Sequence, residues 1–486
     1  MSPTSKFPVT ASGGHERERV DTTQDSTRSR SWLRAGSILL TTLATTLFAG
    51  CASRSLPAEK EARQQATEVG RMYRPEGRKP ALPTLSAESR PTDYLRFALL
   101  NHPQVEAAYY DWRAAVEAIA PARALPNPQL TFQADITDTV MSLMPGLMFD
   151  IMAPGKRAAM GREATASSAV AYRAYATAVI GTAAEVRKAW VELAYLEEAL
   201  ALRRQSAAML EQSLAAAQAE YATGRGMGTF EEQTKFLNET GRLKNELAVL
   251  TERRTAARTR FKSALGLRRE DADPAWPAQP FPSAPLPDDE ALWRQTLAAN
   301  PQLAEMRAMV EMTVAQTDVA RRARTPDFTA GLMVDLKADP LMLRPTATMT
   351  LPIWREKIAG IVASADARRL AAEARLNAEQ LAMATELAQM LFMVREADRM
   401  ASYIDDTALP NLARALASAE AAYQSGMGGF GPLAELRLMQ LAMQLERADA
   451  RREREATLAD LSLLVAGDVP AAGLLTASTR SLEFSP

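Results

Sequence analysis

The stretch Asn101-His102-Pro103-Gln104-Val105 has a counterpart in Asn300-Pro301-Gln302-Leu303, and this pair decides how the chain is organised. Prolines recur at the same constant interval, since Pro128 answers Pro326 and Pro154 answers Pro352. Further along, Tyr221-Ala222-Thr223-Gly224 answers Tyr423-Gln424-Ser425-Gly426. Self-similarity at a fixed period indicates that one structural unit occurs twice. The sequence therefore predicts a tandem-duplicated protomer.

The duplication sets the boundaries that we expect along the chain. The first repeat covers residues 91–267 and the second covers residues 288–467. Residues 268–287 between them hold six prolines, which cannot continue a helix, so this segment reads as an extended linker. Residues 51–90 form a segment before the first repeat, and residues 468–486 form a C-terminal tail.

Each repeat contains a very long helical stretch, from about residue 156 to 221 and from about 354 to 423. At 1.5 Å per residue each would be about 100 Å long, which suits the wall of a tunnel. Pro410 interrupts the second stretch and predicts a kink or an irregular turn. Near their ends both stretches have apolar residues at gaps of three and four, and we expect these seams to join the helices of neighbouring protomers. The seams are Ala207, Leu210, Leu214, Ala217 and Tyr221 in one repeat, and Leu409, Leu412, Leu416, Ala419 and Tyr423 in the other.

Two short strand-like segments precede each long helix, and they alternate apolar and polar residues. Leu130, Phe132, Ala134 and Ile136 share one face of the first segment, and Phe328, Ala330, Leu332 and Val334 share one face of the third. This period-2 pattern is typical of membrane β-barrels, but a half-buried soluble sheet alternates in the same way. Four strands cannot close a barrel, and open sheet edges are not tolerated in lipid. Three chains would supply twelve strands, so the pattern favours a trimeric, 12-stranded barrel.

The N-terminus resembles an export signal. Residues 1–50 combine a polar extension that reads as disordered, several arginines, and an apolar run from Ala35 to Ala49 that is too short to span a bilayer. The run ends in Leu47-Phe48-Ala49-Gly50-Cys51, which resembles a bacterial lipobox, and Cys51 is the only cysteine of the chain. Phe48 stands where leucine is usual, and an ordinary signal peptide with an incidental cysteine is the alternative. We expect Cys51 to be lipidated and to anchor residues 51–90.

The composition argues against several functional classes. The net charge is −1, and no basic patch points to nucleic acid. The chain has only two histidines and one cysteine, which are too few for a zinc site, a disulfide or most catalytic triads. We therefore expect no enzyme activity and no cofactor.

Taken together, the lipobox, the duplicated halves, the Pro-Asn-Pro-Gln-Leu stretch at 126–130 and the paired Tyr-x-x-Gly turns resemble the TolC-like outer membrane factor family of efflux lipoproteins. The resemblance covers roughly residues 90 to 467. It implies a mainly α protein with a small β part, in which a trimeric 12-stranded outer-membrane barrel continues into a long periplasmic α-helical barrel. It also implies an exit channel that works with a periplasmic adaptor and an inner-membrane pump. The alternative is a lipid-anchored periplasmic coiled-coil scaffold.

The resemblance also assigns expected sites. The glycine-rich turns would be the periplasmic tips that dock the adaptor, and nearby acidic residues would ring the closed pore, although the same acids also suit helix N-termini. The tip residues are Gly224, Arg225, Gly226, Met227 and Gly228 in one turn and Gly426, Met427, Gly428 and Gly429 in the other. The candidate gate residues are Glu231, Glu232 and Glu435.

The cargo is open between heavy-metal ions and drugs or other organic compounds. Pro154-Gly155-Lys156-Arg157 resembles the metal-efflux branch of the family. In the second strand Met144, Met148 and Met152 share one face, and thioethers are soft ligands for Cu(I) and related ions. Methionine is also a common packing residue, and Pro145 leaves the register of this strand open.

Overall fold

The computed structural model describes residues 56–136, 140–223, 230–277, 286 and 288–465. The predicted signal peptide, Cys51, the tip Gly224–Gly228 and the C-terminal tail lie outside these residues. In the part of the chain that is described, no helix has both the length and the apolar character needed to cross a membrane.

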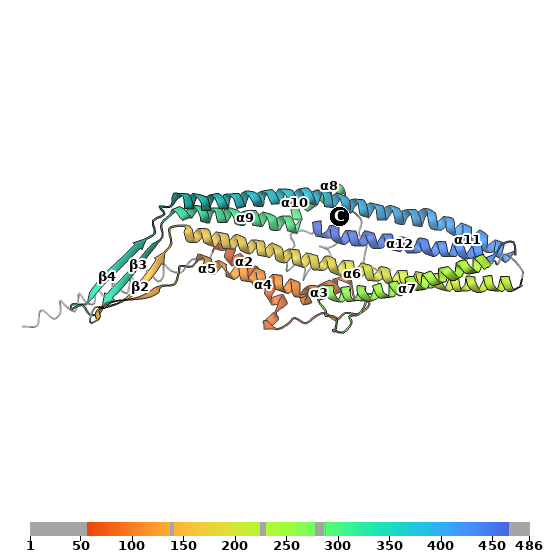
Figure 1. Ribbon diagram of the computed structural model, residues 1–486, viewed down its shortest axis with the longest axis horizontal. Coiled ribbons are helices and arrows are strands. Elements are labelled where there is room, and N and C mark those ends of the chain that lie inside the picture. The colour runs from red at the N-terminus through yellow and green to blue at the C-terminus, as the bar shows by residue number, and fades with distance from the viewer. Residues whose placement is uncertain (1–55, 137–139, 224–229, 278–285, 287, 466–486) are drawn as a thin grey trace, which may run out of the picture. The chain divides into compact units, whose positions relative to one another are not determined.

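The two halves have the same order of elements, which confirms the duplication (Figure 1). The first half consists of α3 (Pro91–Asn101), α4 (Pro103–Glu117), α5 (Ile119–Arg123), β1 (Gln129–Ile136), β2 (Val140–Ile151), α6 (Lys156–Thr223) and α7 (Phe230–Ala264). The second half consists of α8 (Asp289–Ala299), α9 (Pro301–Arg321), η2 (Arg322–Arg324), β3 (Phe328–Asp335), β4 (Met342–Met349), α10 (Arg355–Tyr403), η3 (Ile404–Ala408), α11 (Leu409–Gln424) and α12 (Phe430–Val465).

The duplicated Asn-Pro motif closes each repeat. Pro103 and Pro301 occupy the first turn of α4 and α9, where a missing backbone N–H costs nothing. Asn101 Nδ2 donates to the carbonyl of Leu265 at 3.1 Å, just after α7. Asn300 Nδ2 donates to the carbonyl of Leu464 in α12, also at 3.1 Å. Each asparagine therefore ties the beginning of its repeat to the end of that repeat's last helix.

The four strands form one antiparallel sheet in the order β1-β2-β3-β4. The central pair, β2 with β3, joins the two repeats, with Leu147 opposite Leu332 and Gly146 opposite Met333. The predicted alternation is confirmed. One face carries exposed apolar side chains, which include Leu130, Phe132, Leu147, Phe149 and Leu332. The opposite face carries polar residues, methionines and glycines.

The long helices are also confirmed. Helix α6 has 68 residues, which corresponds to about 100 Å. In the second repeat the equivalent stretch is divided, because a π-helical turn, Ile404–Ala408, separates α10 from α11. Pro410 follows in the first turn of α11, so the irregularity lies where proline removes a helical hydrogen bond. Helix α6 packs against α7 and α12, and α12 packs in turn against α10 and α11.

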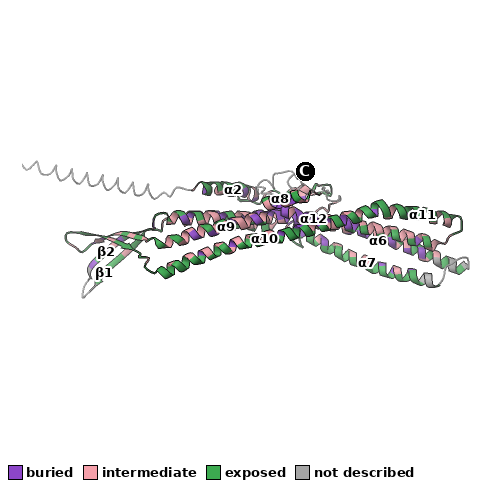
Figure 2. Ribbon diagram, turned by 90° about the horizontal axis from the view of Figure 1, so that it is seen from above, coloured by how far each residue is buried: buried purple, intermediate pink, exposed green. Residues whose placement is uncertain are grey.

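Buried residues gather where the first helix of the second repeat meets the long helices (Figure 2). Leu292 of α8 packs among side chains of α10 and α12 such as Leu391 and Leu458. The equivalent cluster in the first repeat contains Tyr94 and Trp190, whose rings lie 4.9 Å apart in an edge-to-face arrangement. The two clusters hold the short helices of each repeat against the middle of the long ones.

Helix α2 (Pro57–Tyr73), which follows the predicted lipid anchor, packs against α4 and α6 of the first repeat. Tyr73 stacks on Tyr109 of α4 and contacts the ring edge of Tyr175 in α6. Glu59, at the beginning of α2, is buried with 1% exposure and pairs with Arg123 at 2.6 Å and with Arg63 at 3.3 Å. Burial alone would raise the pKa of Glu59, but the hydrogen bond and charge of Arg123, with that of Arg63, hold the pKa below its ordinary value.

Replacing Glu59 with alanine should loosen α2, because it removes the buried carboxylate that pairs with Arg63 and Arg123. Removal of one partner of a buried ion pair costs about 3 kcal/mol. Because the folded pKa of Glu59 is lowered, its contribution is present above the ordinary carboxyl pKa and disappears as the pH falls through the folded value. Limited trypsin digestion at pH 7 should therefore cut α2 faster in Glu59→Ala than in the parent protein.

The matched control for this change is Glu61→Ala on the exposed side of the same helix. It should be cut at the parental rate. Equal rates for all three proteins at pH 7 would show that the Glu59 pair does not hold α2.

Candidate functional site

The tip of the second repeat is a Schellman turn centred on Gly426. Gly426 has φ +74°. Its N–H donates to the carbonyl of Tyr423 at 3.1 Å, and the N–H of Met427 donates to the carbonyl of Ala422 at 2.9 Å. This pair of bonds is the pattern with which a left-handed glycine ends a helix. A β-carbon at Gly426 would meet nothing within 4 Å, so backbone conformation and not crowding requires glycine here.

An exposed methionine and an aromatic contact characterise the loop around this turn. Met427 is 84% exposed, which makes it the most exposed large apolar side chain of the described residues. Tyr423 before the turn and Phe430 after it meet edge to face, with centroids 5.7 Å apart. The turn thus presents a flexible apolar side chain on a loop whose two stems are held together by an aromatic contact. The corresponding tip of the first repeat lies outside the described residues.

Glu435, one of the predicted gate residues, is paired across the two repeats. It accepts a hydrogen bond from Lys235 of α7, and both side chains are more than half exposed. Arg437, two residues further along α12, pairs with Glu420 of α11. Of Glu231 and Glu232 the structure describes only the backbone, which belongs to α7. Two separate ion pairs near the tip thus join α12 to α7 and α12 to α11.

The predicted leucine seam packs inside the chain. Leu210 of α6 is 1% exposed and forms a cluster with Phe236 and Leu243 of α7. The partly buried Leu214 and Leu438, from α6 and α12, pack against that cluster. Leu412 and Leu416 of α11 are buried as well, with 8% and 4% exposure. The expectation that these seams join neighbouring protomers is therefore wrong, because the helices that cover them belong to the same chain.

Ion pairs bind α6 of the first repeat to α12 of the second. Arg187 and Glu455 lie 2.9 Å apart with 8% and 12% of their side chains exposed. Lys188 pairs with Asp460 at 2.9 Å and with Glu185 at 2.7 Å. Burial would lower the pKa of Lys188, but the two carboxylates raise it above its ordinary value. Sequence reasoning missed this contact, because the partners come from helices of different repeats.

The Pro-Gly-Lys-Arg stretch connects the sheet to the helices. Lys156 begins α6 and pairs with Asp327, the residue just before β3. Asp327 also accepts the N–H of Ala153 at 2.9 Å, and its carbonyl accepts the N–H of Thr350 at 2.9 Å. A single aspartate thus joins the segments that follow β2 and β4. The structure gives this stretch a role at the junction between strands and helices.

Of the three methionines predicted to share one face of the second strand, two lie in that strand. Met144 and Met148 lie in β2 on the polar face, and Met144 is 2% exposed. Met152 follows the last residue of β2 and has no place in the sheet register. Met333 of β3, directly opposite Gly146 and 9% exposed, and Met342 of β4, opposite Asp335, lie on the same face. The prediction is therefore wrong for Met152, which lies beyond the end of β2.

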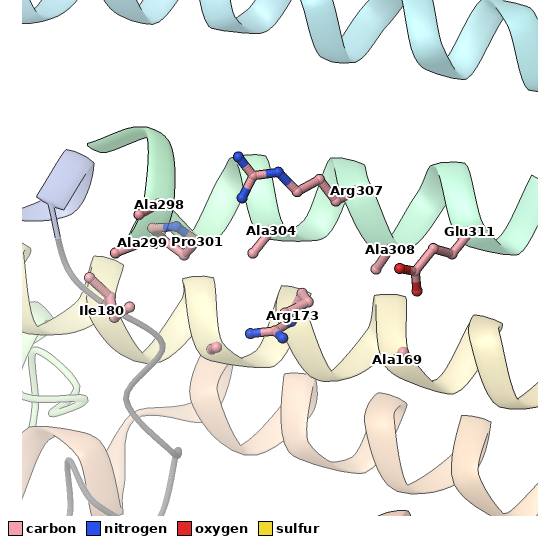
Figure 3. A pocket seen from close by; sticks show the side chains of 11 residues that line it. Ala169, Arg173, Ile180, Ala298, Ala299, Pro301, Ala304, Arg307, Ala308 and Glu311 are labelled. Carbon is pink, nitrogen blue, oxygen red and sulfur yellow. The ribbon is translucent and has the colours of Figure 1, made fainter. Parts of the chain in front are cut away.

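A hollow of about 270 Å³ lies between α6, α8 and α9 (Figure 3). Alanines form much of its wall, and Arg173, Arg307 and Glu311 supply its charged side chains. Arg307 donates to the carbonyl of Leu297 at 2.6 Å. None of the predicted site residues lines this hollow, so its shape reflects the small residues with which α6 and α9 approach each other.

The sequence matches the family described as Outer membrane efflux protein over residues 95–267 and 292–467, more than half of the chain. No curated protein matches the chain in sequence. Among solved structures, CusC shares 15% identity over 80% of this chain and 98% of its own, with a TM-score of 0.66. VceC of Vibrio cholerae shares 16% over 78% and 96%, with a TM-score of 0.63. MtrE of Neisseria gonorrhoeae, an outer membrane channel solved in its open state, shares 16% over 80% and 94%, with a TM-score of 0.66. At these identities the likeness establishes the fold.

Proposed function

Because this chain belongs to the outer membrane efflux protein family, we propose that three copies of it form the exit channel of a tripartite efflux system. The channel receives substrates from an inner-membrane pump through a periplasmic adaptor and releases them outside the cell. The observation that carries this proposal is the two-faced sheet, whose apolar face is left exposed by the single chain.

The exposed face has the chemistry of a lipid-facing barrel wall. Leu130 and Phe132 of β1 are 66% and 71% exposed, and Leu147, Phe149 and Ile151 of β2 are each more than 40% exposed. Exposing a row of apolar side chains of this size to water is unfavourable, whereas contact with lipid acyl chains is favourable. The edges of the sheet, β1 and β4, each lack one neighbour within the described residues. Pairing β4 of one copy with β1 of the next supplies that neighbour and closes the barrel.

The helices support the same assembly. Within the described chain α6 and α12 have helical neighbours on both sides, while α7 and the α10–α11 pair form the flanks. Large apolar side chains are exposed on these flanks, among them Leu237 of α7 at 61% and Leu381 and Phe392 of α10 at 74% and 56%. We infer that α7 of one copy packs beside α10 and α11 of the next. This arrangement continues the barrel as a helical tube into the periplasm.

The experiment compares detergent extraction with salt extraction, and then measures the assembly. A channel requires detergent, migrates as a heat-resistant trimer, and restores efflux of a reporter dye when expressed with its pump and adaptor. A lipid-anchored scaffold would also require detergent, but it would give no ion conductance in planar bilayers. A monomeric or dimeric protein without conductance would overturn the proposal.

Anchoring by lipid at Cys51 belongs to this proposal, because it would place residues 51–90 on the outer membrane beside the barrel. Cys51→Ser should abolish incorporation of labelled palmitate, since the serine hydroxyl is not the thiol that the lipid transfer uses. Barrel insertion and trimer formation should persist in this variant. Labelling at the parental level would remove the lipid anchor from the proposal.

A further inference from the structure

A cleft of about 450 Å³ lies between α2 and α4, and positive charge dominates its lining. The charged residues of the lining are Arg63, Arg71, Arg74, Arg113 and Glu117. Two of the arginines are neutralised, since Arg63 pairs with Glu117 at 3.0 Å and Arg74 pairs with Glu106. Arg71 and Arg113 have no carboxylate partner among the residues that the structure describes. The cleft therefore carries an excess of positive charge.

The floor of this cleft is fixed by a close approach of α2 to α4. Tyr109 Oη donates to the carbonyl of Ala66 at 3.1 Å. A β-carbon at Gly70 would lie 2.2 Å from that oxygen, so glycine allows the two helices to lie this close together. Tyr110, the next residue of α4, is 39% exposed at the rim. An exposed aromatic ring beside unpaired guanidinium groups is typical of a surface that a protein partner covers.

The cleft lies at one flank of the chain. In the half nearest the strands the helices follow one another in the order α4, α6, α9 and α10 (Figure 1). Helix α4 comes before β1, and α10 comes after β4. Pairing of β4 of one copy with β1 of the next therefore sets α10 of the first copy beside α4 of the second. This joint rests on the trimeric channel proposed above.

The duplication supplies a template for the joint. The repeated prolines correspond at a shift of 198 residues, which makes α4 the counterpart of α9 and α6 the counterpart of α10. The contact of α6 with α9 inside the chain should therefore recur between copies as a contact of α10 with α4. Ala308 and Glu311 of α9 line the hollow against α6. Their counterparts in α4 are Tyr110 and Arg113, so two residues that line the cleft also face the next copy.

The face of α10 that would meet them consists of small residues. On α6 the hollow is lined by Ala169, Arg173 and Ala176, whose counterparts on α10 are Ala367, Ala371 and Ala374. In the single chain Ala367 and Ala374 are exposed. Within the chain, α9 thus presents an alanine to a face with an arginine, whereas between copies α4 presents a tyrosine to a face of alanines. The large ring and the small residues are complementary in shape, as close packing requires.

A carboxylate of α10 lies on the side of the helix from which α2 approaches. Tyr73 of α2 contacts the ring edge of Tyr175 in α6, and Glu373 of α10 is the counterpart of Tyr175. Glu373 should therefore lie at the height of Tyr73 along the tube and on the same side of the tube as α2. Its side chain is 41% exposed, and one of its oxygens accepts from Arg369 at 2.5 Å. The other oxygen can accept from a second guanidinium, and Arg71 is two residues from Tyr73.

We propose that the cleft between α2 and α4 is a socket for α10 of the adjoining copy. Tyr110 packs against Ala371 and its alanine neighbours. Leu370, which is 55% exposed in the single chain, enters the cleft beside them. Glu373 supplies the carboxylate that Arg71 lacks. Helix α2 forms the outer lip of this socket, so the segment before the first repeat takes part in assembly.

The first test is photo-cross-linking of the full-length protein in detergent. Tyr110→p-benzoylphenylalanine keeps an aromatic ring at the rim and adds a photoreactive group. Illumination should produce two linked chains on a denaturing gel, and tryptic digestion should locate the link in residues 370–375. The matched control is Asp111→p-benzoylphenylalanine, which places the group at an exposed position on another face of α4. It should give no link to α10.

The second test exchanges the charges. Arg71→Glu and Glu373→Arg each place like charges at the joint, and each should lower the temperature at which the trimer dissociates. The two changes together should restore most of the parental value, which separates the contact between copies from the bond of Glu373 to Arg369. Glu386→Arg is the control, because this exposed residue lies about 20 Å further along α10. Combined with Arg71→Glu, it should restore nothing.

The outcomes distinguish the socket from the channel. A trimer with no link from position 110 to α10 and no restoration by the exchanged charges would overturn the socket and leave the channel standing. Linkage to detergent or lipid in place of a second chain would also overturn the socket, because another occupant would then fill the cleft. A monomeric protein would overturn both the socket and the proposed channel.

Discussion

Leu210→Glu should lower the free energy of unfolding by about 3–5 kcal/mol, the cost of an uncompensated charge in a packed interior. Leu210 is 1% exposed in a hydrophobic cluster with Phe236 and Leu243. The glutamate must either remain buried without a partner or force α7 away from α6. Because α7 is a flank of the chain, its displacement should also prevent packing against the next copy.

The measurement is the temperature at which the detergent-solubilised trimer dissociates, with thermal unfolding followed by circular dichroism. Leu210→Ala should fall between parent and glutamate variant, at about 2–3 kcal/mol, because it creates a cavity without adding a charge. Ala208→Glu places the same carboxylate on the exposed side of α6 and should leave both transitions unchanged. A heat-resistant trimer in Leu210→Glu with parental stability would contradict the role of this cluster.

Gly426→Val should abolish efflux while the trimer persists. At φ +74° a β-branched residue is strained, and a left-handed conformation costs a non-glycine residue about 1–2 kcal/mol. A β-carbon at this position would contact no other atom, so the effect comes from backbone strain alone. We expect the turn to relieve this strain by changing its backbone conformation. That change breaks the two hydrogen bonds that end α11 and moves the exposed Met427 from the surface that we propose for adaptor docking.

The loss of efflux is measured with a dye in cells that contain the pump and the adaptor. Cross-linking of the variant to the adaptor shows whether docking is the step that fails. Gly426→Asn is the matched control, because asparagine tolerates the left-handed region better than other side chains. Efflux should decrease in the order glycine, asparagine, alanine, valine. Full efflux by the valine variant would show that the tip conformation is not needed for docking.

Much of the architecture could be read from local patterns. The repeated Asn-Pro motif, the long uninterrupted helical stretches and the alternating strands each depend on residues within a few positions of one another. For this reason the duplication, the length of α6, the irregularity near Pro410 and the two faces of the sheet were all predictable. Pro145 left the register of β2 open, and only the pairing with β1 and β3 placed Met144 and Met148 on the polar face.

The tertiary structure decided which elements meet. A heptad seam shows that a helix packs through Leu210, but it does not show that the covering helices belong to the same chain. Gly146 and Met333 come from different repeats, so no local period could show that they lie opposite each other. The pairing of Glu435 with Lys235 likewise joins α12 to α7. Periodicity determines the face that a residue occupies, whereas strand register and helix order determine its partner, and both depend on contacts between residues far apart in the sequence.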